Sequence, residues 1–336
     1  MKILEEDNIT KSVKEMYLKY PYPSPSRETV ETNELLNLLR IFEIETKTKF
    51  ENSKILDAGS GTGHRIINVA KHFNKSKFTG ADISKKSLEI ANELKKKNNV
   101  INIDFIEKNI LTNISELGKY NAILCMGVLH HLSNPQQGLE ILSKMLEKDG
   151  IIFLYLYGSL GGHKRMLNKE LISILLGNQK TNYDLGIELV RDIGFNKFDY
   201  GWNLKYKNKE EEDSLIVDSL LHVNEFLYDS IEIEKLFKQS GLFGFVIYGI
   251  SVGTNGLIFE TDITSTEKLH MPQTNILHKL ESKLALEKYE SRETIEKYRI
   301  LDLLYEPNGY TIVGFTKDGY EKFANERIKR NFIKIN

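Results

Sequence analysis

The chain has 336 residues, of which 40% are hydrophobic and 28% charged, and its 46 basic and 47 acidic side chains leave a formal charge of −1. This composition excludes collagen-like, disordered and membrane-spanning chains, and the near-zero charge argues against a protein that neutralises many nucleic-acid phosphates. A single cysteine, Cys125, excludes an internal disulfide framework and a cysteine-based zinc site. Because the N-terminus has no apolar signal core, we expect a soluble, cytoplasmic protein. The length predicts two domains, or one domain with a large addition.

The first 50 residues predict a helical arm with a stiff bend. Residues 8–20 have the apolar spacing of an amphipathic helix. Residues 20–25 read Tyr-Pro-Tyr-Pro-Ser-Pro, and the three prolines force an extended segment. Apolar spacing around residues 35–42 predicts a second helix.

From residue 54 onwards, short apolar runs alternate with amphipathic stretches. The predicted strands are residues 55–58, 77–82, 103–106, 122–126 and 151–157. The predicted helices between them are residues 66–73, 84–97 and 135–146. This alternation indicates βαβ units and a mostly parallel sheet, and right-handed connections make the sheet doubly wound, an α/β fold.

The pattern weakens beyond Gly158. Further helices are expected at residues 164–176, 215–221, 231–239 and 275–305, and strands at residues 243–248 and 257–259. Residues 158–162 are expected to be flexible, residues 205–213 a solvated loop or helix end, and residues 310–316 a hairpin. We therefore predict three parts: an arm or lid (1–50), a cofactor-binding core (51–160) and a C-terminal α+β substrate region (161–336).

The most informative segment is residues 57–63, Asp-Ala-Gly-Ser-Gly-Thr-Gly, between a predicted strand and a predicted helix. Glycine permits positive φ and close approach of a ligand, and the start of the helix offers N–H groups. A dinucleotide fingerprint requires Gly-x-Gly-x-x-Gly, but counting from Gly59 puts His64 at the third glycine position. Asp57 also suits an ammonium or sulfonium charge better than a pyrophosphate.

Asp82 ends the second predicted strand, after the glycine-rich segment. An acidic residue at this place accepts both ribose hydroxyls of an adenosine. The alternative is a cap for the helix that begins near Ser84. Since several cofactors contain adenosine, Asp82 alone does not separate an NAD site from another nucleoside site.

Four segments carry a family resemblance when taken in order: residues 57–63, residues 80–84 (Gly-Ala-Asp-Ile-Ser), residues 107–110 (Glu-Lys-Asn-Ile) and residues 125–132 (Cys-Met-Gly-Val-Leu-His-His-Leu). Together they resemble the ordered motifs of class I S-adenosylmethionine-dependent methyltransferases over roughly residues 54–157. The resemblance implies a transferase with a Rossmann-like methyltransferase fold and S-adenosyl-L-methionine as its cofactor.

The resemblance also implies roles for single residues. The glycines would shape the wall around the methionine part, Asp57 would lie near its amino group, and Asp82 would bind the ribose. Asn109, where many members carry Asp, would meet the adenine edge, and Met126 would line the methyl-transfer channel. The cofactor-binding candidates are Asp57, Gly59, Ser60, Gly61, Gly63, Asp82, Ile83, Asn109, Ile110 and Met126.

A second resemblance lies outside the core. Residues 17–23, Tyr-Leu-Lys-Tyr-Pro-Tyr-Pro, resemble the arm of a subgroup of bacterial methyltransferases that includes lysine methyltransferases of outer-membrane proteins. Residues 218–228 and then 233–241 resemble the segment that follows the core of that subgroup. The subgroup implies an amine acceptor, although such arms occur beside several substrate types.

The catalytic candidates are Tyr17, Tyr20, Tyr22, His130 and His131. The tyrosines would form an aromatic wall that attracts sulfonium or ammonium charge, or would pack the arm onto the core. The histidines have a pKa near neutrality and would act as a general base, or would pack against the adenosine.

Other polar residues give weaker indications. Residues 163–165, His-Lys-Arg, predict a solvated turn, with an acidic acceptor group as the alternative ligand. His222 is left open between a structural and a functional role. No His, Asp or Glu cluster has the spacing of a metal site, so we expect no metal.

We therefore predict N-methylation of an amine on a protein lysine or a peptide-like substrate. The alternatives are a small-molecule O-, N- or C-methyltransferase of secondary metabolism, an NAD-dependent oxidoreductase and a cofactor-binding module without catalysis. The expected partner is the protein, peptide or small-molecule acceptor, with neither nucleic acid nor membrane, and the helix predicted at residues 275–305 is a candidate for a homodimer contact.

Overall fold

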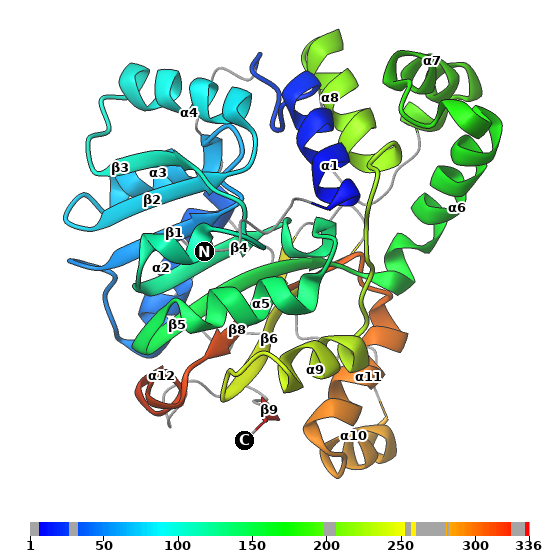
Figure 1. Cartoon of the computed structure of the whole chain (residues 1–336). Helices are drawn as coiled ribbons and strands as arrows, with labels where there is room; N and C mark the ends of the chain where they lie inside the picture. Colours follow the sequence, from blue (N-terminus) through cyan, green and yellow to red (C-terminus); the bar gives the residue numbers. More distant parts are fainter. Residues whose placement is uncertain are drawn as a thin grey trace.

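The computed structural model describes residues 7–26, 33–197, 206–252, 257–259, 280, 282–323 and 333–335. Its strands form one nine-stranded sheet in the order β3-β2-β1-β4-β5-β8-β6-β7, with β9 paired to β6 (Figure 1). The strands are β1 (Lys54–Ala58), β2 (Lys77–Asp82), β3 (Ile103–Glu107), β4 (Tyr120–Met126), β5 (Leu146–Tyr157), β6 (Gly244–Ser251), β7 (Leu257–Phe259), β8 (Gly309–Phe315) and β9 (Ile333–Lys334).

The parallel part of the sheet is the part that the sequence predicts. Strands β1 to β5 pair in parallel and are connected through helices, which confirms the α/β fold class. The other strands pair antiparallel and continue the same sheet beyond β5. The helices are α1 (Asn8–Lys19), α2 (Asn33–Thr46), α3 (His64–His72), α4 (Lys85–Lys97), α5 (Pro135–Lys144), α6 (Ser159–Leu176), α7 (Tyr183–Ile193), α8 (Lys209–Leu220), α9 (Ser230–Lys238), α10 (Lys283–Glu290), α11 (Thr294–Tyr305) and α12 (Lys317–Phe323).

Alternate strand residues enter two cores, one on each face of the sheet. In β1, Ile55 packs with α2 and α3, whereas Leu56 packs on the opposite face with α5 and α9. Because helices cover both faces of the sheet, successive strand residues are buried whichever face they point to, and the strands are therefore short continuous apolar runs. The doubly wound arrangement therefore follows from two apolar faces that both need helices.

The C-terminal region differs from the prediction at residues 310–316 and 275–305. Residues 309–315 are not a hairpin but the single strand β8, which lies between β5 and β6 and bonds to both. The predicted long helix falls partly outside the described residues, and the rest is divided into α10 and α11. The division occurs because Glu293 and Glu296 form a capping box that starts α11.

Residues 158–162 are also unlike the prediction, because they join β5 directly to α6, which begins at Ser159. A Cβ atom at Gly158 would lie 2.1 Å from the carbonyl oxygen of Pro307, and one at Gly161 would lie 2.3 Å from that of Glu306. These glycines therefore allow two backbone segments to approach closely. Within residues 206–213, Asn208 caps α8 and the helix begins at Lys209, in agreement with the predicted helix end.

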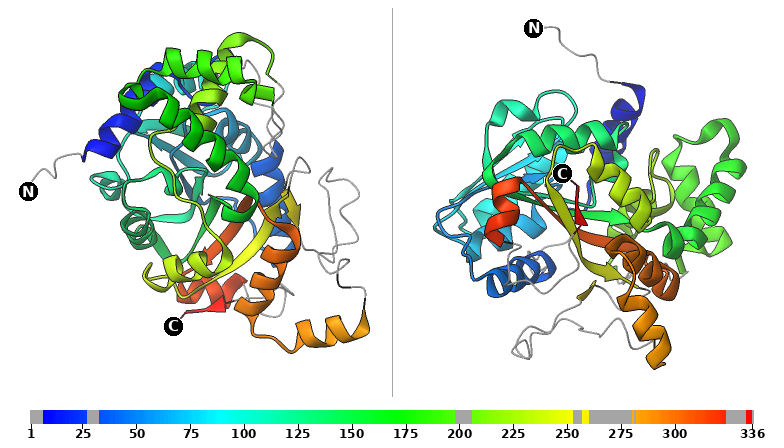
Figure 2. Two further views of the ribbon diagram at one scale, coloured as in Figure 1. Left: turned by 90° about the vertical axis from the view of Figure 1, so that its right-hand side faces the viewer. Right: turned by 90° about the horizontal axis from the view of Figure 1, so that it is seen from below.

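Helices α1, α6, α7 and α8 form a third core of their own, which we call the helical cap. Its buried side chains include Met16 of α1, Ile172 of α6, Val190 of α7 and Val217 of α8. Figure 2 shows α6 and α7 standing to one side of the sheet, and Figure 1 shows α1 beside α8. The arm is thus divided, because α2 packs on the sheet whereas α1 packs in the helical cap. No helix in the described ranges is long and apolar enough to cross a membrane.

Candidate functional site

The glycine-rich loop lies at the carboxyl end of β1, and three of its glycines have positive φ values. Gly59, Gly61 and Gly63 have φ values of +87°, +52° and +77°. A Cβ at Gly59 would lie 2.3 Å from the Val128 side chain, and one at Gly61 would lie 2.5 Å from the Tyr22 carbonyl oxygen. On the side where a Cβ would stand, these two glycines make room for protein atoms. Contact of the glycines with a ligand stays a prediction.

Asp82 holds this loop from the end of β2. Its carboxylate accepts the Gly61 N–H at Oδ2 and the Ser84 N–H at Oδ1, both at 2.8 Å. Burial raises the pKa of Asp82, and the two N–H donors oppose that effect. The cap of α4 is not Asp82 but Ser84, whose hydroxyl accepts the Ser87 N–H. Asp82 thus fixes the glycine-rich loop to the start of the segment before α4. Its contact with a ribose stays a prediction.

Asp57 is a buried carboxyl group at the end of β1. Burial raises its pKa to about 7, while Arg65 lowers it and Asp82 raises it further. The Arg65 guanidinium donates to the Met126 carbonyl at 3.0 Å, which places it beside the ends of β1 and β4. A cation that binds near such a buried carboxyl group stabilises its ionised form and lowers its pKa.

Two features of the loop region fit a ligand. The Ser60 hydroxyl is buried and has no hydrogen-bond partner in the part of the chain that the structure describes. A Cβ at Gly127, just after β4, would meet no described atom within 4 Å. An unsatisfied buried hydroxyl and open space at adjacent strand ends are what a polar ligand would complete.

The predicted adenine-binding residues follow β3. The Asn109 side-chain oxygen accepts the Leu111 N–H at 2.8 Å and so shapes its own loop. Ile110 is buried in the core beneath it, and Ile83, half-buried, lies between β2 and α4. The structure therefore places all three at the carboxyl edge of the sheet, and their contacts with adenine stay predictions.

The arm is attached directly to the glycine-rich loop. The Thr62 hydroxyl donates to the Pro23 carbonyl at 3.0 Å, and the Thr62 N–H points to the Tyr22 carbonyl at 3.4 Å. Ser84 donates to the Tyr17 carbonyl at 3.2 Å. Both strand ends that carry the acidic residues are thus covered by the arm.

The three arm tyrosines make different contacts. The Tyr17 hydroxyl donates to Asp218 of α8 at 2.8 Å, inside the helical cap. The Tyr20 hydroxyl donates at 2.7 Å to Asp184 of α7, which is exposed, so Tyr20 attaches the arm to the outside of the cap. Tyr22 contributes its carbonyl oxygen to the loop contact. Tyr20 is thus held apart, whereas Tyr17 and Tyr22 both lie close enough to Tyr157 to interact electrostatically with it. Tyr17 lies in a buried polar cluster, and an aromatic wall over the methyl group stays a prediction.

His130 and His131 lie in a short 3₁₀ turn after β4, within a stack of rings. The His130 ring lies 3.9 Å from that of Tyr157, and the His131 ring lies 3.8 Å from that of His222. Burial lowers the pKa of His131 to about 4, and it lowers the pKa of His130 and of His222 well below the ordinary value. All three are neutral at neutral pH, and proton transfer by His130 or His131 stays a prediction.

Four charged residues of this region were missed or misjudged from the sequence. Arg165, predicted in a solvated turn, is 2% exposed and pairs with Glu225 through both guanidinium nitrogens. Lys169 donates to the same Glu225 carboxylate at 2.9 Å. Asp218 completes the group beside Tyr17. Arg165 and Lys169 are four residues apart on α6, and this spacing puts both side chains on the same face of the helix. The spacing is the signal from which the sequence could have indicated that they act together.

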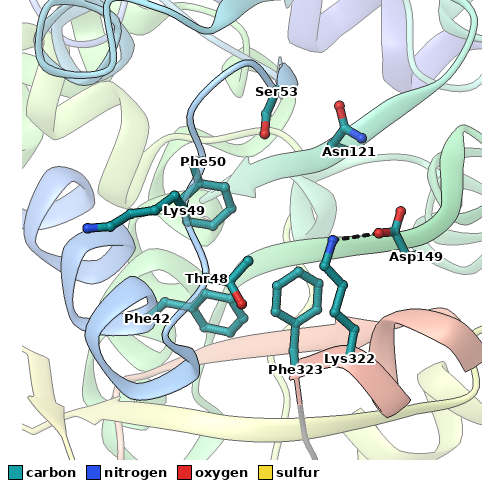
Figure 3. Close-up of a pocket in the computed structure, with 9 residues that line it drawn as sticks. All are labelled: Phe42, Thr48, Lys49, Phe50, Ser53, Asn121, Asp149, Lys322 and Phe323. Atoms are coloured by element: carbon teal, nitrogen blue, oxygen red, sulfur yellow. Dashed lines mark hydrogen bonds and ion pairs between the residues drawn. The ribbon is translucent and has the colours of Figure 1, made fainter.

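A small cavity lies elsewhere, at the opposite edge of the sheet from the glycine-rich loop. It has a volume of about 50 Å³ and is lined by Phe42, Phe50, Ser53 before β1 and Asn121 near the start of β4, among others (Figure 3). Ligand pockets for cofactor-sized molecules are several times larger, on the order of 300 Å³ or more. It is therefore not the predicted site.

Comparison with known proteins assigns one segment of the chain to a family. Residues 49–194 match the family described as "Methyltransferase domain". This segment is a class I S-adenosylmethionine-dependent methyltransferase domain. It extends beyond the predicted core into α6 and α7 of the helical cap.

Relatives of this methyltransferase domain include two uncharacterised bacterial proteins. One from Synechococcus is 28% identical over 249 residues, 70% of this chain and 59% of the relative. One from Rickettsia prowazekii is 31% identical over 156 residues, 46% of this chain and 62% of the relative. The chain therefore spans less than two thirds of the length of each.

A solved structure extends the similarity beyond the domain. PKMT2 from Rickettsia typhi has a TM-score of 0.57 and 18% identity, covering 82% of this chain and 52% of PKMT2. The complex of PKMT2 with AdoHcy has a TM-score of 0.56. The likeness is one of fold, and it includes more of this chain than the methyltransferase domain alone.

The residues at the carboxyl edge fit S-adenosylmethionine, the cofactor of this class. The Ser60 hydroxyl offers the hydrogen bond that it lacks, and the Asp57 carboxyl group is suited to the ammonium or sulfonium charge. Asp82 keeps lone pairs for two ribose hydroxyls beyond the two N–H bonds that it accepts.

Proposed function

We propose that this chain transfers a methyl group from S-adenosylmethionine to an amine on a protein lysine or a peptide-like substrate. The observation that carries this proposal is the attachment of the tyrosine arm to the glycine-rich loop, with the Tyr17 hydroxyl held by a buried carboxylate. A buried carboxylate that accepts from a phenol suits a cationic acceptor.

The cofactor, when bound, supplies an activated methyl group on a sulfonium. In our proposal Asp57 faces its amino group, Asp82 its ribose, and Asn109 with Ile110 its adenine. Met126 and the open space at Gly127 lie on the side from which the acceptor approaches. The protein's contribution is to orient the two reactants and to exclude water.

Two similarities support the amine acceptor. The Tyr-Pro-Tyr-Pro arm resembles that of a subgroup with lysine methyltransferases among its members. PKMT2 has a similar fold over 82% of this chain, a length greater than that of residues 49–194. The proposal therefore uses the flanking regions as well as the methyltransferase domain.

The experiment is an incubation of the protein with S-adenosylmethionine that carries a labelled methyl group. The acceptors are a lysine-bearing protein mixture, the same mixture with its lysines acetylated, and a set of small hydroxyl, carboxyl and amine compounds. We expect label in the unmodified proteins and its loss on acetylation. Labelling of hydroxyl or carboxyl compounds alone would refute the amine proposal.

A small-molecule methyltransferase is the second candidate, and one observation favours it. His130, His131 and Tyr157 are less than 10% exposed, so the rings near the ends of β4 and β5 are closed to a large acceptor, whereas a metabolite needs a smaller opening. Label that appears in small molecules of a cell extract, with none in protein, would select this candidate. The NAD-dependent oxidoreductase is not retained, because the core is a methyltransferase domain.

A further inference from the structure

We propose that Asp218 receives the ammonium group of the methyl acceptor and takes one proton from it. This inference rests on the amine acceptor proposed above. Asp218 is 4% exposed, and its Oδ1 accepts the Tyr17 hydroxyl at 2.8 Å. Across the described residues no donor is bonded to its Oδ2.

The charged groups around Asp218 balance its carboxylate without forming an ion pair with it. Arg165 and Lys169 are close enough to affect Asp218, but both donate to Glu225. These three residues have a net charge of +1, and an ionised Asp218 brings the cluster to zero without an ion-pair partner of its own. A buried carboxylate with one hydrogen bond is costly, and a bound ammonium group would complete it.

Two histidines beside Tyr17 add hydrogen-bonding capacity that the protein does not use. The Nε2 atoms of His131 and His222 are buried and have no partner among the described residues. His222 Nδ1 accepts the Asn224 N–H at 3.1 Å, so its proton lies on Nε2. His131 Nδ1 lies 3.0 Å from the Asn224 carbonyl and must donate to it, so its Nε2 is an acceptor. A donor and an acceptor thus remain for a ligand on the His131–His222 stack, whose His222 ring lies against Tyr17.

The position of Tyr17 ties this cluster to the cofactor end of the sheet. The Tyr17 carbonyl is bonded by Ser84, whose N–H is bonded to Asp82. The Tyr17 ring lies 5.7 Å from the ring of His222, edge to face. The acceptor site that we infer therefore adjoins the place where the ribose is expected.

The proton transfer needs only the acceptor ammonium group and the Asp218 carboxylate. One N–H bond of the acceptor ammonium breaks, its electron pair stays on nitrogen, and the proton forms an O–H bond on Asp218. The nitrogen then has the lone pair that methyl transfer requires. Tyr17, which donates to Oδ1, leaves Oδ2 as the atom that takes the proton.

The test compares Asp218→Asn with Asp184→Asn. Asp184 accepts the Tyr20 hydroxyl at 2.7 Å, so it makes the same kind of bond from the arm to the helical cap at an exposed place. We expect Asp218→Asn to raise the KM for a lysine-bearing peptide about tenfold or more, because a buried charge partner is lost. We expect both variants to bind S-adenosylhomocysteine as the parent does, by calorimetry.

A binding measurement gives a readout apart from turnover. n-Butylamine at neutral pH, a probe for the ammonium group, is titrated by NMR into protein saturated with S-adenosylhomocysteine. We expect binding to the parent and to Asp184→Asn, and its loss in Asp218→Asn. Equal KM and equal n-butylamine binding in the two variants would overturn the role of Asp218 while leaving amine methylation standing.

Failure of the proposed function gives a different result, namely a parent protein that binds S-adenosylhomocysteine but methylates no amine. If Asp218→Asn does not fold, Tyr17→Phe replaces it, since this variant keeps the carboxylate and removes its donor. We expect Tyr17→Phe to bind n-butylamine but to have a kcat at least about tenfold lower, because the carboxylate loses its orientation. An unchanged kcat would then overturn the inference.

Discussion

Two carboxyl groups at neighbouring strand ends are held in different ways. Asp82 accepts two backbone N–H groups, whereas Asp57 is buried beside Arg65 with a pKa of about 7. The first arrangement stabilises a carboxylate before any ligand binds, and the second leaves a group whose charge depends on pH and on a bound cation. Substitution of Asp82 is therefore expected to affect ligand binding, and substitution of Asp57 to affect the pH dependence of stability.

Replacement of Asp82 by Ala removes the acceptor of the Gly61 and Ser84 N–H groups as well as the expected ribose contact. Hydrogen bonds to a charged group contribute about 1.5–3 kcal/mol each, so S-adenosylhomocysteine should bind at least about tenfold more weakly. Calorimetry measures the Kd, and Asp104→Asn, at an exposed residue of β3, is the control. An unchanged Kd would contradict the ribose role.

Asp57 should make the stability of the ligand-free protein depend on pH. Its pKa is raised from 3.8 to about 7 on folding, so the folded state binds the proton more tightly. Stability is therefore lost as the pH rises from about 4 to about 7 and is constant above that. Asp57→Asn removes this loss, and we expect it to be more stable than the parent at pH 8, by up to about 4 kcal/mol.

Urea unfolding of both proteins between pH 4 and pH 8 measures this difference. The control is again Asp104→Asn, whose side chain is exposed. A difference between Asp57→Asn and the parent that does not grow with pH would show that Asp57 is already ionised in the folded protein at low pH.

At the scale of elements, the contact between the arm and the glycine-rich loop depends on Gly61. Its φ of +52° matches the +53° of Gly177, which has open space around it among the described residues. A Cβ atom costs about 1–2 kcal/mol of backbone strain at either position. At Gly61 it would also collide with the Tyr22 carbonyl. Substitution of Gly177 by Ala therefore measures backbone strain alone, whereas substitution of Gly61 by Ala adds the loss of the contact with the arm.

We expect Gly61→Ala to detach the arm and Gly177→Ala to leave it in place. Hydrogen exchange of residues 8–20 measures attachment, and protection should fall in Gly61→Ala alone. Methyl transfer should fall at least about tenfold in the same variant, because water would enter the site. Equal protection in the two variants would mean that the arm is held by its contacts with α7 and α8 instead.

At the scale of the whole molecule, the sheet and the helical cap are joined by a buried ion cluster. Glu225 lies in the segment between α8 and α9 and is paired with Arg165 and Lys169 of α6. Its pKa is lowered to about 2, since these two cations outweigh the effect of burial. The stability that Glu225 contributes is therefore present above about pH 4.5 and is lost as the pH falls toward 2.

Glu225→Gln should leave two buried cations short of a partner and lower the free energy of unfolding by about 3–5 kcal/mol at pH 7. Glu107→Gln removes an exposed pair with Lys14 and should change it by less than about 1 kcal/mol. Guanidinium unfolding of both variants and the parent measures these values. A loss in Glu225→Gln no larger than that in Glu107→Gln would show that the cluster does not stabilise the fold.

The methyltransferase fold and its cofactor were predictable because their signals are local. A buried strand is a short apolar run, a loop at a strand end is marked by glycines, and Asp82 stands at a fixed place after them. Each signal lies within a few residues, so the chain carries it without reference to the rest of the molecule. The family comparison confirms the class, while the acceptor, the site roles and a homodimer stay predictions.

The contacts that the candidate site residues make with distant parts of the chain could not be predicted from local sequence patterns. Tyr17 and Asp218 are 201 residues apart, and their contact depends on how α1 and α8 pack in the helical cap. Strand β8 lies between β5 and β6 because of sheet pairing that its own apolar run does not encode. The sequence by itself thus determined the cofactor-binding half of this protein, since periodicity and turn chemistry are local. Only the tertiary structure decided which acidic and aromatic side chains meet between α1 and α8, since burial and charge pairing depend on long-range packing.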